Sequence, residues 1–113
     1  MPAPLKTAYL KVAPDKNGLQ VMFDKDVARM LNFEDMADDD LRSITAPTLL
    51  ITAQHDVVTP EHVLKMSRLI PGATLVILPG THGGFIGAAE ASTAKDSKLP
   101  GVTAALVQEF LNE

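Results

Sequence analysis

The chain has 113 residues, about the length of one small domain, and 46% of them are hydrophobic and 21% charged. This composition is typical of a globular protein and excludes a fibrous or collagen-like chain. The net charge of −4 argues against a nucleic-acid partner, and the absence of cysteine excludes disulfides and thiolate chemistry. Because no apolar run approaches the roughly 20 residues that span a bilayer, we expect no membrane partner and a cytoplasmic location.

In the first third of the chain, the spacing of the apolar residues indicates secondary structure least clearly. Prolines and turn-forming residues crowd positions 2–18, which predicts an extended or loop segment. Apolar residues at helical spacing follow from Val21 to Phe33, and they predict a helix near 24–33. Its first turn would carry acidic residues, which the helix dipole favours.

An acidic stretch at 34–40 comes next. Its carboxylates do not alternate as a calcium loop requires, and no glycine follows at the necessary position. We therefore interpret the stretch as a solvated loop that caps a short turn at 41–44, rather than as a cation site.

Beyond residue 46 the predicted elements are clear. Residues 48–52 form a short apolar run after Pro47, which predicts a strand buried on both faces. Thr59 is suited to cap a helix, and an apolar stripe over 60–70 predicts that helix. A second apolar run at 74–78 predicts another strand, which Pro-Gly closes.

The order of these elements predicts an α/β fold. The connection 53–73 is long enough for a parallel crossover, which needs about a dozen residues or more. A loop with a marginal helical turn is expected over 83–98, and a final amphipathic helix is expected from Val102 to Leu111. No linker divides the chain, so we expect one domain.

Two polar residues follow the predicted strands at equal spacing. Asp56 lies four residues after Thr52, and His82 lies four residues after Leu78. Ligands of open α/β sheets collect beyond the carboxyl ends of the strands, so both residues would lie at the same edge. A carboxylate there could orient the imidazole and leave its other nitrogen as a base, although an Asp after a strand is often only a turn residue.

The residues around these positions resemble a known family. The run Ala-Pro-Thr-Leu-Leu-Ile-Thr-Ala-Gln-His-Asp at 46–56, and then Thr-Pro at 59–60, Ile-Pro-Gly-Ala at 70–73 and Pro-Gly-Thr-His-Gly-Gly-Phe at 79–85, resemble the C-terminal portion of an α/β-hydrolase. The resemblance implies that Asp56 is the acid and His82 the base of a Ser–Asp–His triad.

The same resemblance sets the expected organisation of the chain. Residues 41–113 would be the last two parallel strands of the hydrolase sheet, with their crossover helix and the C-terminal helix. Residues 1–40 resemble the end of the family's lid segment and would be helical or extended. The substrate implied is a small molecule with an ester or a related bond, and no cofactor is expected.

Parts of the family pattern are missing. The nucleophile elbow G-x-S-x-G and an HGGG-type oxyanion motif occur nowhere in the chain, and none of its four serines lies between glycines. We therefore expect the chain to be inactive by itself. No metal is expected either, because His55 and His62 lack the spacing of a zinc site.

A different class of function stays open. The chain could be a stand-alone, non-catalytic interaction or assembly module derived from an α/β-hydrolase. The predicted strand 48–52 has only one predicted neighbour, so its other edge would be a template for a further strand. This predicts a homodimer that pairs through the exposed sheet edge.

Overall fold

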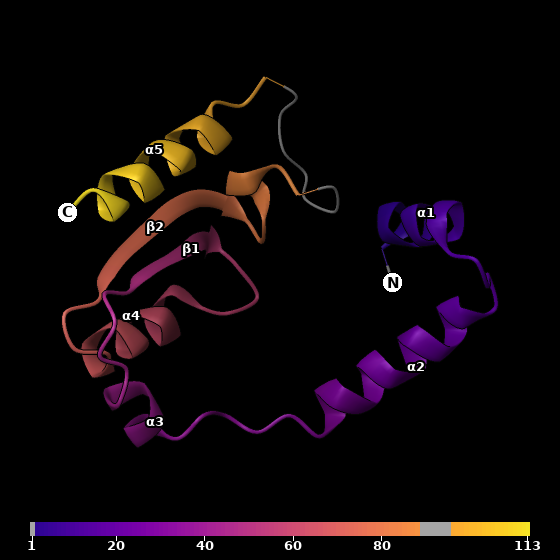
Figure 1. Ribbon diagram of the computed structural model, residues 1–113, viewed down its shortest axis with the longest axis horizontal. Helices are drawn as coiled ribbons and strands as arrows, with labels where there is room; N and C mark the ends of the chain where they lie inside the picture. Colours follow the sequence, from indigo (N-terminus) through magenta and orange to yellow (C-terminus); the bar gives the residue numbers. More distant parts are fainter. Residues whose placement is uncertain (1, 89–95) are drawn as a thin grey trace. The chain divides into compact units, whose positions relative to one another are not determined.

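The computed structural model describes residues 2–88 and 96–113 (Figure 1). The chain divides into two compact units, Met1–Asp35 and Met36–Glu113. The sequence patterns placed the corresponding boundary after residue 40. Within the described ranges, no helix is both long and apolar enough to cross a bilayer.

The first unit contains helix α1 (Ala3–Val12) and helix α2 (Gly18–Leu31). The prediction of an extended or loop segment over 2–18 is therefore wrong for most of its length. Two of its three prolines, Pro2 and Pro4, lie at the N-cap and in the first turn of α1, where the missing N–H of proline leaves no helical hydrogen bond unmade. Pro14 follows the end of the helix. Helix α2 begins earlier than the predicted helix at 24–33, directly after the turn that ends at Asn17.

The acidic stretch contributes a short helix, α3 (Asp38–Arg42), to the second unit. The loop predicted over 34–40 is thus wrong for its last three residues, and the helical turn begins earlier than predicted. Three aspartates occupy the first turn of α3, where the helix dipole favours negative charge. Asp39 also pairs with Arg42 at 2.7 Å, and Asp38 with Lys65 at 3.6 Å.

The second unit is built on strand β1 (Leu49–His55), helix α4 (Pro60–Leu69) and strand β2 (Thr74–Thr81). The two strands pair in parallel, so the predicted strand–helix–strand unit is confirmed. Helix α4 begins where the sequence indicated, because the hydroxyl oxygen of Thr59 accepts a hydrogen bond from the backbone N–H of His62 at 3.2 Å.

Both strands are longer than predicted because the ladder continues past an irregularity. Ala53 pairs with Leu78, and the next pair is His55 with Thr81, so β2 has one extra residue between these pairs. Gly80 lies in this bulge with a φ of +101°, a conformation that side chains with a Cβ rarely adopt. The Pro-Gly pair that was expected to close the strand therefore bends it instead.

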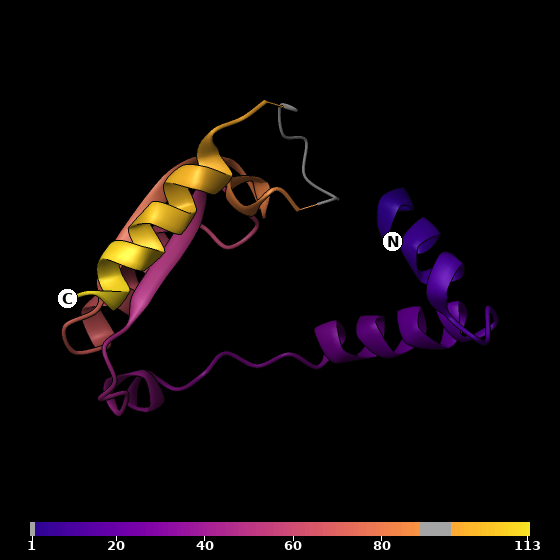
Figure 2. The same cartoon turned by 45° about the horizontal axis from the view of Figure 1, so that its top comes forward.

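Helices α4 and α5 (Leu99–Leu111) lie on opposite sides of the two strands (Figures 1 and 2). Helix α5 includes the predicted final helix and begins three residues before it. A short 3₁₀ helix, η1 (Gly84–Ile86), falls in the segment expected to be a loop with one helical turn. The loop predicted over 83–98 also includes residues 89–95, which lie outside the described residues.

The hydroxyl of the buried Thr103 joins α5 to η1. Its oxygen lies 2.9 Å from the carbonyl oxygen of Phe85 and 2.8 Å from that of Leu99. This contact holds the segment that follows His82 against the last helix.

The buried residues of the second unit come from both strands and from helices α3, α4 and α5. Ile70 is only 2% exposed and Ala53 is fully buried. The first half of β1 is only half-buried, so the expectation of a strand buried on both faces is wrong for residues 49–51. A two-stranded sheet leaves an edge of each strand without a neighbouring strand, which explains the exposure. The buried apolar side chains are Leu41, Ala53, Val63, Ile70 and Leu78.

Candidate acid–base site

The register of the sheet brings the two predicted site residues together. His55 and Thr81 are the last paired residues of β1 and β2, and Asp56 and His82 directly follow them. Because the strands are parallel, both residues leave the sheet at the same edge. The backbone N–H of Asp56 also donates to the carbonyl of Ala53 at 3.3 Å, which turns the chain at the strand end.

The Asp56 carboxylate and the His82 imidazole form a hydrogen bond. The Oδ1 atom of Asp56 lies 2.8 Å from Nδ1 of His82, so the predicted proximity of the two side chains is confirmed. With an ionised carboxylate as acceptor, Nδ1 carries the proton and Nε2 of the neutral ring is free to accept one. The Asp56 side chain is 8% exposed and that of His82 is 64% exposed. The acid is therefore sheltered, while the imidazole faces solvent.

The pKa of Asp56 is lowered from its ordinary value of 3.8. Burial by itself would raise the pKa of this carboxyl group, because it disfavours the charged form. The hydrogen bond from His82, backbone N–H bonds from Val58 and Val57, and the charge of the imidazolium lower the pKa and together outweigh burial. The environment thus keeps Asp56 ionised, as an orienting carboxylate must be.

This shift predicts that acid destabilises the second unit. Since the folded pKa of Asp56 lies below the unfolded one, the unfolded chain binds more protons below the ordinary value of 3.8. The stabilisation is fully present above that value and is lost as the pH falls through the folded pKa. Urea titrations between about pH 5 and pH 2 should show a steeper loss of unfolding free energy for the wild type than for His82→Ala.

His62→Ala is the matched control for this titration. The His62 ring is exposed on α4 and has no carboxylate partner among the described residues, so this variant should keep the wild-type slope. Equal slopes for wild type and His82→Ala would contradict the coupling between the two side chains.

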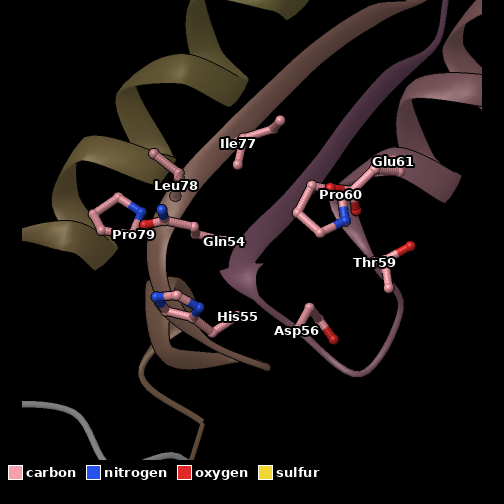
Figure 3. A pocket seen from close by; sticks show the side chains of 9 residues that line it. All are labelled: Gln54, His55, Asp56, Thr59, Pro60, Glu61, Ile77, Leu78 and Pro79. Atoms are coloured by element: carbon pink, nitrogen blue, oxygen red, sulfur yellow. The ribbon is translucent and has the colours of Figure 1, made fainter.

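A broad depression of about 800 Å³ lies beside Asp56 (Figure 3). One wall comes from the end of β1 and the start of α4, and the other comes from β2. His55 was expected to face solvent at this loop mouth, and it is exposed there. Asp56 was predicted as the acid of the site. The sequence analysis did not assign the remaining lining residues to it, although a polar residue at the end of a strand, as at Gln54, was an available signal. The lining residues are Gln54, His55, Asp56, Thr59, Pro60, Glu61, Ile77, Leu78 and Pro79.

The depression offers polar and apolar contacts, but metal ligands do not converge on it. Across residues 2–88 and 96–113, no three His, Asp or Glu side chains gather closely enough to hold a metal ion.

Comparisons with known proteins add no relative to this description. No family model, no curated protein and no solved structure matches the chain.

Proposed function

We propose that this chain supplies the acid and the base of a Ser–Asp–His hydrolase of the α/β-hydrolase type, acting on an ester or a related bond. The hydrogen bond of 2.8 Å between Asp56 and His82 at adjacent parallel strand ends is the observation that carries the proposal. The lowered pKa of Asp56 supports it, because the acid of such a triad must stay ionised to orient the base.

In the proposed reaction, Nε2 of His82 takes the proton of a serine hydroxyl as its oxygen attacks the substrate carbonyl. Asp56 stabilises the imidazolium that forms. His82 then gives the proton to the leaving alcohol, and the acyl group stays on the serine. In the second half, His82 accepts a proton from water as the water oxygen attacks the acyl carbonyl. The bond to the serine oxygen then breaks, His82 returns the proton to that oxygen, and the acid is released. The exposed imidazole and the sheltered carboxylate suit these two roles.

The serine and the oxyanion donors would come from polypeptide other than these 113 residues. The sequence contains no G-x-S-x-G elbow, and oxyanion donors usually contribute several kcal/mol to such reactions. The proposal therefore includes that the chain alone has no serine-dependent turnover.

Residues 1–40 fit the lid-like segment of this proposal. A shallow apolar groove of about 390 Å³ lies on the first unit between the start of α1 and the face of α2. Its lining includes Leu5, Phe23, Val27 and Met30. An apolar surface of this kind is what a lid would present to an acyl chain.

Hydrolysis of an activated aryl acetate by the purified chain tests the proposal. We expect a slow rate that increases linearly with substrate, because an oriented imidazole without a nucleophilic serine forms no saturable complex. His82→Ala should remove well over half of this rate, whereas His62→Ala should change it little. Alanine variants of the four serines, Ser43, Ser67, Ser92 and Ser97, should leave the rate unchanged.

Two outcomes would overturn the proposal. A saturable rate that one serine substitution abolishes would show that the chain contains its own nucleophile. A rate that is indifferent to His82→Ala would show that the imidazole is not reactive, which would favour the non-catalytic interaction module instead.

A further inference from the structure

The imidazole of His82 has little packing around it. Its side chain is 64% exposed, so its position depends on the hydrogen bond to Asp56 and on the backbone at either side. On the upstream side, Thr81 pairs with His55 at the end of the parallel ladder. On the downstream side, the chain leaves the sheet and enters the turn that contains η1. The position of this turn therefore helps to set the position of the imidazole.

The turn after His82 is held together by its own backbone. The carbonyl of Gly83 accepts the N–H groups of Ile86 at 3.2 Å and of Ala88 at 3.0 Å. Gly83 and Gly87 flank η1 with φ values of +74° and +71°, in the left-handed region that favours glycine. Because the turn is bonded to itself in this way, a contact at one of its residues also restrains the residue next to His82.

One residue of the turn is bonded to the last helix. The carbonyl of Phe85 receives neither of the N–H groups above, and it accepts instead from the hydroxyl of Thr103 at 2.9 Å. Thr103 is 5% exposed, so little water competes for this bond. The same hydroxyl oxygen lies 2.8 Å from the carbonyl of Leu99, a contact that threonine commonly makes within its own helix. What is particular to this position is the contact with Phe85, 18 residues earlier in the chain.

We infer that Thr103 is a positioning residue for the acid–base pair: its hydroxyl holds the turn after His82 against α5 and so keeps the imidazole within reach of Asp56. Without the hydroxyl, the carbonyl of Phe85 loses its donor, and the turn must move toward water to find another. That movement is passed along the turn to His82. A displacement of about 1 Å at a reacting group can cost on the order of 100-fold in rate. A role of Thr103 in catalysis rests on the proposed function, whereas the state of the His82 ring can be measured without it.

Nitrogen NMR of the His82 ring in the complete chain tests the inference. With the ring neutral, the carboxylate of Asp56 selects the tautomer that carries the proton on Nδ1. Loss of this partner lets the proton move to Nε2 for part of the time, which shifts both nitrogen signals. Thr103→Val has nearly the same shape but no hydroxyl, and it should remove more than half of the Nδ1–H tautomer. Thr103→Ser keeps the hydroxyl and should preserve the wild-type signals.

Two controls separate positioning from a general loss of stability. Ile70→Val removes one carbon from another buried side chain, so it weakens the same unit without touching the turn and should leave the ring signals unchanged. In an Asp56→Asn background, Thr103→Val should shift the ring signals no further, because the carboxylate is already absent. Equal shifts for Thr103→Val and Ile70→Val, or unchanged signals in Thr103→Val, would refute the positioning role.

Hydrolysis of the aryl acetate distinguishes the positioning role from the proposed function. Thr103→Val should lower the rate toward that of His82→Ala, whereas Thr103→Ser should keep the wild-type rate. If the ring signals shift as expected but His82→Ala leaves the rate unchanged, the proposed function is wrong and the positioning role stands. If His82→Ala lowers the rate but Thr103→Val changes neither the rate nor the ring signals, the positioning role is wrong and the proposed function stands.

The wild-type protein provides a test that needs no substitution, in case Thr103→Val does not fold. The carbonyl carbon signal of Phe85 shifts when the hydrogen bond from Thr103 is lost. On heating below the unfolding of the sheet, this signal and the ring nitrogen signals of His82 should shift over the same temperature range. Ring signals that stay constant after the Phe85 carbonyl has lost its donor would overturn the inference.

Discussion

Ile70→Ala is expected to cost the second unit about 2–5 kcal/mol of unfolding free energy. Ile70 is 2% exposed and follows the last turn of α4, where its N–H donates to the carbonyl of Met66 at 3.0 Å. Only five apolar residues are buried among the described residues of the chain, so few neighbours can move into the cavity that Ile70→Ala leaves. For a domain with about 5–15 kcal/mol of stability, this loss leaves the native state barely populated or unfolded.

Leu64→Ala is the matched control on the same helix. Leu64 is 43% exposed, so its truncation should cost less than about 1 kcal/mol. Urea unfolding followed by the amide NMR signals of β1 and β2 reports on the second unit alone. Equal losses for the two variants would contradict the placement of Ile70 in the core.

Gly83→Ala should destabilise the loop that holds His82. Gly83 has a φ of +74°, in the left-handed region, where a non-glycine residue costs on the order of 1–3 kcal/mol. A Cβ added there would also lie 2.7 Å from the Cβ of Ala88, which cannot rotate away because it is attached to the backbone. The substitution should lower the unfolding free energy and displace the neighbouring imidazole from Asp56.

Gly101→Ala is the control for Gly83→Ala, and we expect it to raise the unfolding free energy rather than lower it. Gly101 lies in the first turn of α5 with open space around it, so alanine should stabilise the helix by less than about 1 kcal/mol. Urea unfolding gives the stability of both variants, and ¹⁵N NMR of the His82 ring shows whether Nδ1 still donates to a carboxylate. A Gly83→Ala protein with unchanged stability and an unchanged ring signal would contradict the strained loop.

The sequence predicted the strand–helix–strand unit because its signals are local. Thr59 and Pro60 mark the start of α4, and the apolar runs mark the strands. The pairing of Asp56 with His82 followed from topology alone, since parallel neighbouring strands end at the same edge.

The predicted helix and strand bounds were wrong where the position of a residue within its element mattered more than its type. Proline usually interrupts a helix, but Pro4 lies in the first turn of α1, where it is tolerated. The strand ends were misplaced because a bulge at Gly80 lets the ladder continue through a Pro-Gly pair. The edge of the sheet at which a ligand would bind was predicted, but the full lining of the depression beside Asp56 was not, because it comes from side chains of both strands and α4.

The hydrogen bond between Asp56 and His82 joins residues 26 positions apart, so it also has a consequence for folding. Helix α4 can form from local contacts, but the two strand ends meet only after the intervening chain has closed into a loop. An unfolded or partly helical chain therefore has a histidine without a carboxylate partner. The oriented base would appear only when the parallel sheet forms, and the rate at which His82 acquires its partner would measure sheet formation directly.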